Sequence, residues 1–163
     1  MPYCCSNPWS NIFIWGNGDV SHCCYSNAGP IGNIYKQTLE SIWNGKRIKR
    51  IRASMEKGDY TGAGCVHHCR PFRWNRFYGR QGVVPEIPEG FGRMPEHKIE
   101  SGNTVLPKVI TIEIDGKCNL KCAHCLGTGV SKGIAKEKYT EILPLIEKAR
   151  YLRFIGGEFT VNP

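Results

Sequence analysis

Hydrophobic and polar residues alternate with two different periods in the first half of the chain. Residues 11–15 and 20–24 are rich in β-branched and aromatic side chains, and they flank Asn17-Gly18, a pair that favours the tight turn of a β-hairpin. Apolar positions three and four residues apart then predict two short helices, one that begins after Thr38 and one that ends at Gly58. This half therefore predicts a small α+β unit made of a hairpin and short helices.

A second pattern begins near Lys108. A β-branched run predicts a strand, the stretch over residues 138–150 predicts a helix, and residues 151–155 predict a second strand. Strand, helix and strand in this order are typical of a βαβ unit with parallel strands. We expect an α/β chain overall, in which this two-stranded unit has both of its outer edges unpaired.

Length, charge and cysteine count narrow the class of protein. The chain has 163 residues and a formal net charge of +8. It lacks any apolar run near the roughly 20 residues that cross a bilayer, and its start does not have the pattern of a secretory signal. Nine cysteines, an odd number that includes two adjacent pairs, favour metal binding in a reducing compartment over disulfides. We expect a cytoplasmic protein without a membrane partner.

Three of the cysteines carry the clearest chemistry. Cys118, Cys122 and Cys125 form a CxxxCxxC run directly after the strand that begins near Lys108. Three thiolates on one short loop can bind three irons of a four-iron cluster and leave the fourth iron open for a substrate. A zinc site is the alternative, with His124 as a fourth ligand, although His124 lies between two of the cysteines.

This run and a second motif resemble the radical S-adenosylmethionine (SAM) enzymes. In that family CxxxCxxC follows the first strand of the barrel and a Gly-Gly-Glu motif follows the second, as Gly156-Gly157-Glu158 does here. The resemblance implies that the three cysteines hold a 4Fe–4S cluster, that Gly156, Gly157 and Glu158 bind SAM, and that the reaction generates a 5′-deoxyadenosyl radical. It also implies that residues 108–163 are the first βαβ unit of an incomplete radical SAM partial TIM barrel, inactive without the rest of the barrel.

The first seventy residues resemble the SPASM domain, an auxiliary iron–sulfur domain of many radical SAM enzymes. The resemblance rests on short motifs along the segment: Cys5-x-x-Pro8-Trp9, Gly18-x-Val20-x-x-Cys23, Ile31-Gly32-Asn33-Ile34, Ile42-Trp43-Asn44-Gly45, Arg52, and the closing pair Cys65 and Cys69. It implies one auxiliary 4Fe–4S cluster with Cys5, Cys23, Cys65 and Cys69 as ligands, and with Cys4 and Cys24 as alternates. Four thiolates also suit zinc, so ligand type alone leaves a four-cysteine zinc site open.

These observations divide the chain into three segments. Residues 1–70 are the SPASM-like domain, residues 71–107 a linker rich in Gly, Pro and Arg, and residues 108–163 the start of the radical SAM domain. Arginines interleave with aromatics near the start of the linker. This pattern suits packing along the SPASM-like unit, which we favour, or contact with a nucleic acid or an anionic peptide. In the enzymes that the chain resembles the auxiliary domain follows the barrel, whereas here it comes first.

The expected function is that of a radical SAM oxidoreductase that modifies a peptide or a protein side chain. Such an enzyme takes electrons from a donor such as flavodoxin or ferredoxin, and we do not expect a nucleic-acid partner. Two alternatives remain open. One is a non-catalytic iron–sulfur module for electron transfer, and the other is a zinc-stabilised protein that binds nucleic acid through its positive charge.

Overall fold

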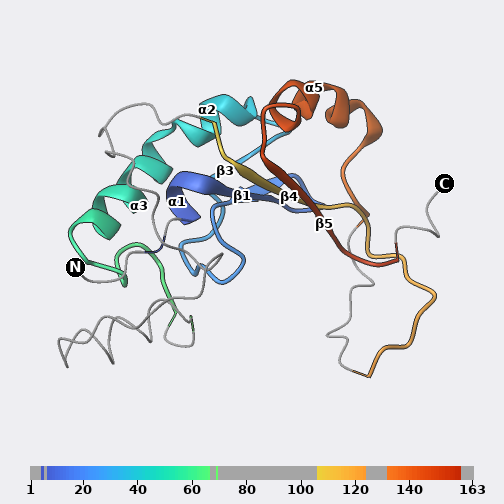
Figure 1. Cartoon of the computed structure of the whole chain (residues 1–163), viewed down its shortest axis with the longest axis horizontal. Coiled ribbons are helices and arrows are strands. Elements are labelled where there is room, and N and C mark those ends of the chain that lie inside the picture. Colours follow the sequence, from blue (N-terminus) through green and yellow to red (C-terminus); the bar gives the residue numbers. More distant parts are fainter. Residues whose placement is uncertain (1–4, 6, 67–68, 70–105, 124–131, 159–163) are drawn as a thin grey trace.

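The computed structural model describes residues 5, 7–66, 69, 106–123 and 132–158 (Figure 1). Its centre is a five-stranded mixed sheet with the strand order β3-β2-β1-β4-β5, and the sheet is not closed into a barrel. The predicted linker, residues 71–107, lies almost entirely outside the described residues. The strands are β1 (Asn11–Ile14), β2 (Asp19–Ser21), β3 (Gly32–Asn33), β4 (Val109–Glu113) and β5 (Tyr151–Ile155).

The predicted hairpin is confirmed. β1 and β2 are antiparallel, and Gly18 has a φ of +83° in the turn between them. The return strand ends at Ser21, before the predicted end at residue 24, so Cys23 and Cys24 follow the strand. β3 adds a short third strand to β2 that the sequence did not predict, because two residues are too few to show a period.

β4 and β5 are parallel, as the βαβ pattern predicts, and within the described sheet the outer edge of β5 is unpaired whereas that of β4 is paired. The expectation of two unpaired edges was wrong, because β4 also pairs in parallel with β1. The register places Ile12 beside Ile110 and Ile14 beside Ile112. Side chains in register point to the same face, so this pairing gathers four isoleucines into one buried layer.

The helices are α1 (Asn7–Ser10), α2 (Leu39–Trp43), α3 (Lys46–Glu56) and α5 (Lys136–Ile146). The predicted start after Thr38 is confirmed, because the Thr38 hydroxyl accepts a hydrogen bond from the Ser41 N–H at 3.2 Å. The C-terminal helix begins and ends earlier than the predicted 138–150. Its last predicted turn instead leads into the sheet, where Tyr151 N donates to the carbonyl of Lys108.

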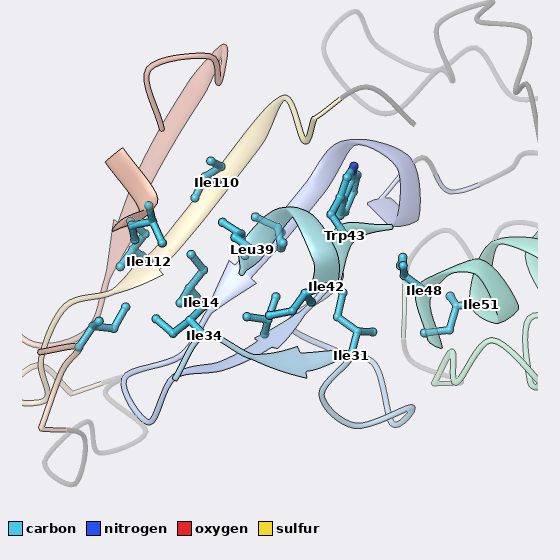
Figure 2. Packing of buried hydrophobic residues seen from close by; sticks show 14 of the residues in the cluster. Ile14, Ile31, Ile34, Leu39, Ile42, Trp43, Ile48, Ile51, Ile110 and Ile112 are labelled. Atoms are coloured by element: carbon cyan, nitrogen blue, oxygen red, sulfur yellow. The ribbon is translucent and has the colours of Figure 1, made fainter. Parts of the chain in front are cut away.

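One hydrophobic core joins the two halves of the chain. Leu39 and Ile42 of α2 lie over the sheet near Ile14, Ile110 and Ile112 (Figure 2). Ile142 from α5 and residues of α3 extend the same cluster. Among the described helices, none is both long enough and apolar enough to cross a membrane.

Candidate metal centres

Four cysteines from three segments line one pocket in the N-terminal half. Cys5 precedes α1, Cys23 follows β2, and Cys65 and Cys69 come from the turns after α3. The structure therefore brings together the four predicted ligands of the auxiliary cluster. The other lining side chains are apolar or neutral polar: Asn7, Pro8, His22, Tyr25, Ser26, Met55, Tyr60 and Val66.

The hairpin carries Cys23 to this pocket. Phe13 lies opposite Ser21 in the antiparallel pair, so Cys23, two residues further on, is level with the start of β1. The start of β1 is also where α1 ends and where the chain leads back toward Cys5. The reversal depends on Gly18, because a φ of +83° is unfavourable for residues with a side chain.

A close backbone contact positions the last two cysteines. Gly64 has a φ of +79°, and a Cβ at this position would collide with the backbone of Ala28. Glycine allows the approach, and Asn27 N donates to the Gly64 carbonyl at 2.8 Å. The segment after α3 is thereby fastened to the loop that follows β2, and the Cys65 sulfur lies 3.9 Å from that of Met55.

The surroundings of Cys5 disfavour a lone thiolate. Burial raises the pKa of the Cys5 thiol from 9.0 to about 12, against the hydrogen bond from the Asn7 backbone, and the neighbouring thiols of Cys23, Cys69 and Cys65 add to the rise. A bound cationic metal offsets both effects, because it supplies the positive charge that closely spaced thiolates require. Metal binding at this pocket therefore has to release protons.

The pocket distinguishes the alternates that the sequence left open. Cys23 lines it and accepts a hydrogen bond from Tyr25 N at 3.4 Å, whereas Cys24 is exposed and does not line it. The geometry therefore favours Cys23 over Cys24 as a ligand. Cys4 lies outside the described residues, so its role as an alternate stays a prediction.

The pocket supplies as many cysteines as a four-iron cluster binds. No three His, Cys, Asp or Glu side chains in the described part of the chain come close enough to hold one metal ion. Four thiols around a shared pocket suit a four-iron cluster, in which each cysteine binds a different iron. The buried charge also suits an anionic cluster, because Arg52 is the only charged residue among the buried side chains that the structure describes.

Arg52 is one of the residues that resemble the SPASM motifs, but the motif spacing predicts no role for it. Arg52 follows Ile48 by four residues and precedes Met55 by three, and all three are buried. A charged residue on the buried stripe of a helix is the signal that could have identified it, because an arginine is seldom fully buried without a partner. His22, next to Cys23, is also buried and lines the pocket.

The second cysteine group lies on the loop after β4. Cys118 and Cys122 are exposed, and Leu120 N donates to the Cys118 sulfur at 3.4 Å. Lys117 N donates to the Asp115 carboxylate at 2.8 Å, which fixes the turn into the loop. Cys125, the third predicted ligand, lies outside the described residues.

The segment Gly156-Gly157-Glu158 packs against the start of this loop. Gly157 N donates to the Asp115 carbonyl at 2.6 Å, and Glu158 N donates to the Lys117 carbonyl at 2.9 Å. A Cβ on either glycine would collide with one of these two carbonyls. The two motifs therefore form one unit at the carboxyl ends of parallel strands, which is where open α/β sheets bind ligands.

The two cysteine groups lie at opposite ends of the strands. The pocket is level with the start of β1, whereas the second group follows the end of β4, which runs parallel to β1. Five residues of strand span about 16 Å. In Figure 1 the loop after β4, coloured yellow to orange, accordingly extends on the far side of the sheet from α3.

A comparison with known families also assigns iron–sulfur cluster binding to the segment that contains the cysteine pocket. The family model of SPASM, described as an iron–sulfur cluster-binding domain, matches residues 4–71, whereas a radical SAM core is not detected. Residues 4–71 are therefore a SPASM domain, whose function is to bind an iron–sulfur cluster, and the zinc alternative for this segment is not supported. SPASM domains occur in radical SAM enzymes. No curated protein and no solved structure matches the chain.

Proposed function

We propose that the chain belongs to a radical SAM enzyme with an auxiliary cluster, and that the intact enzyme modifies a peptide or a protein side chain. The observation that carries the proposal is the pair of backbone hydrogen bonds that join Gly157 and Glu158 to Asp115 and Lys117, directly before Cys118. A cysteine loop and a Gly-Gly-Glu segment that pack on each other at the ends of parallel strands suit a shared ligand better than two unrelated turns.

Each part of this unit has a distinct role in the proposal. Cys118, Cys122 and Cys125 hold a cluster, and Gly156, Gly157 and Glu158 orient the methionine part of SAM beside it. When bound, a 4Fe–4S cluster with one open iron supplies the electron that cleaves SAM to the 5′-deoxyadenosyl radical. The glycines let the SAM-binding backbone approach the loop, because a side chain on either one would push the two segments apart.

The SPASM pocket has a separate role in the proposal. Cys5, Cys23, Cys65 and Cys69 hold the auxiliary cluster at the other end of the strands, where it relays electrons rather than binding the same substrate atoms. A donor such as flavodoxin or ferredoxin supplies the electrons. The placement of the two cysteine groups at opposite ends of β1 and β4 supports this division.

The matched family also favours a second candidate, because a SPASM domain is found and a radical SAM core is not. This candidate is a non-catalytic iron–sulfur module for electron transfer. It requires a cluster in the pocket and predicts no response of any cluster to SAM.

Electron paramagnetic resonance separates the two candidates. The full chain is reconstituted with iron and sulfide under anaerobic conditions, reduced with dithionite and measured with and without SAM. The proposal predicts a signal that changes on addition of SAM and a Cys122→Ala variant that lacks this change. Cys24→Ala is the matched control and keeps it. An unchanged signal in the unsubstituted chain, or a change that persists in Cys122→Ala, contradicts the proposal.

A further inference from the structure

We propose that Arg52 is the fixed counter-charge of the auxiliary cluster and raises its reduction potential. The inference rests on the proposed ligand set Cys5, Cys23, Cys65 and Cys69. It assigns to Arg52 a positioning and electrostatic role that neither the cysteine spacing nor the matched family states.

The Arg52 side chain is hydrogen-bonded to a residue that lines the cysteine pocket. Arg52 is 5% exposed, and its Nε donates to the carbonyl of Pro8 at 2.8 Å. Pro8 lines the pocket and is separated from Cys5 by two residues. The Cζ atom lies 4.5 Å from the centre of the Trp43 ring, so the charge rests between an aromatic face and the backbone of the Cys5 turn.

Most of the hydrogen-bonding capacity of Arg52 is unused. Nη1 and Nη2 are both buried and have no hydrogen-bond partner in the part of the chain that the structure describes. Burial lowers the pKa of Arg52 to about 10, against the opposing effect of Glu56 one turn further along α3. The group is therefore still a cation at neutral pH. A buried cation of this kind is costly unless an anion lies near it.

The described lining of the cysteine pocket includes no carboxylate. His22 is 3% exposed and lines the pocket next to Cys23. Arg52 is the one charged residue among the buried side chains that the structure describes. No buried carboxylate of the described residues competes for it.

A cluster with four thiolate ligands supplies the missing anion. Two units of positive charge on the iron–sulfide core and four thiolates leave a net charge of −2, and one-electron reduction makes it −3. A fixed cation lowers the energy of the more negative state further, so it favours reduction. The effect depends on charge and proximity, and does not require a hydrogen bond from Arg52 to the cluster.

The test measures the potential of the auxiliary cluster alone. The full chain carries Cys118→Ala, Cys122→Ala and Cys125→Ala, is loaded with iron and sulfide, and is titrated with dithionite while absorbance and spin resonance are recorded. In this background Arg52→Gln removes the charge and Arg52→Lys keeps it. Arg50→Gln is the matched control, because Arg50 is an exposed arginine on the same helix whose charge water screens.

The expected result for Arg52→Gln is a reduced-to-oxidised ratio about tenfold lower at a fixed potential, which is a shift of about 59 mV for one electron. Arg52→Lys should restore most of the shift and Arg50→Gln should cause none. A purely structural arginine predicts equal potentials in all variants that hold a cluster, and that result overturns the proposal. If the Arg52→Gln chain binds no cluster, cluster binding by the Arg52→Lys chain supports a role for the positive charge. Loss of the cluster in Arg52→Lys as well overturns the proposal.

The same titration separates this proposal from the proposed ligand set. A background chain with Arg52 intact that binds no cluster overturns both. A cluster that forms in the background chain, but whose potential Arg52→Gln leaves unchanged, overturns only the role of Arg52.

Discussion

The two cysteine groups differ in how much of their surroundings the described chain supplies. Cys5, Cys23, Cys65 and Cys69 line a pocket between apolar side chains, with a buried arginine hydrogen-bonded to one of the lining residues. Cys118 and Cys122 are exposed on a loop that backbone hydrogen bonds fasten to the Gly-Gly-Glu segment. A pocket lined by its own domain supplies both the metal ligands and the side chains that surround the metal. An exposed loop supplies ligands only, and other parts of the protein have to surround the metal.

The sheet shows the same difference. Ile110 and Ile112 of β4 are buried beneath α2, but their register neighbours on β5, Leu152 and Phe154, are 39% and 55% exposed. Among the described residues, the side of the sheet nearest the SPASM domain is covered and the β5 edge is not. Large apolar side chains on an uncovered face suit packing against a further segment.

The largest expected difference concerns thiol reactivity in the metal-free chain. Alkylation requires the thiolate, and a pKa of about 12 in place of 9.0 lowers the thiolate fraction of Cys5 about a thousandfold at pH 8. We expect exposed Cys118 to be labelled by iodoacetamide far sooner than Cys5, as measured by mass spectrometry of peptides after timed quenching. The rate at Cys5 should rise about tenfold per pH unit up to its pKa. Equal rates in the folded chain would contradict the buried pocket.

Stability should depend on the two sides of the sheet unequally. Trp43 is fully buried against Arg52, so Trp43→Ala should lower the free energy of unfolding by about 3–5 kcal/mol. Phe154→Ala on the exposed strand should cost about 1 kcal/mol or less, because water already reaches the ring. Urea denaturation followed by circular dichroism measures both. Similar losses for the two variants would mean that β5 is covered in solution.

The contact between the cysteine loop and the Gly-Gly-Glu segment should respond to one added methyl group. Gly157→Ala places a Cβ against the Lys117 carbonyl, so it should cost about 1–3 kcal/mol and remove hydrogen-exchange protection of the Glu158 amide. Gly58→Ala is the control, because Gly58 has a φ of +75° and open space around its Cβ position. It should leave Glu158 protected. Unchanged exchange in Gly157→Ala would show that the two motifs do not pack.

The smallest effect concerns the helix that covers the sheet. Thr38→Ala removes the hydroxyl that accepts from Ser41 N at the start of α2 and should cost about 1 kcal/mol of stability. Thr38→Ser should retain most of that stability, because serine supplies the same oxygen. A loss in Thr38→Ser as large as in Thr38→Ala would contradict the capping role. Thermal unfolding of the unsubstituted chain, Thr38→Ala and Thr38→Ser measures these differences in stability.

Local patterns predicted the elements that depend on local chemistry. The hairpin at Asn17-Gly18, the start of α2 at Thr38 and the parallel pair β4 and β5 follow from turn residues, a capping hydroxyl and apolar periodicity. The pairing of β1 with β4 does not, because it joins segments far apart in the sequence through a match of buried isoleucines. α1 and β3 are too short to produce a periodic signal.

The candidate sites divide in a similar way. Cysteine spacing identified the residues that meet at the pocket, since ligand type and order carry over from a known family. It could not identify the role of Arg52, because that role depends on a contact with the Pro8 carbonyl and on burial. A single charge among apolar positions of a helix is visible in the sequence, but its partner is not.

The central claim is that the SPASM domain holds its own cluster independently of the second cysteine group. The most direct test is the iron, sulfide and zinc content of the full chain after anaerobic reconstitution when Cys118, Cys122 and Cys125 are all replaced by Ala. We predict about four irons and four sulfides per chain, with a reduced-state spin resonance that SAM does not change. Further replacement of Cys65 with Ala should remove this cluster. Zinc in place of iron, or the loss of all iron from the triple variant, would contradict the claim.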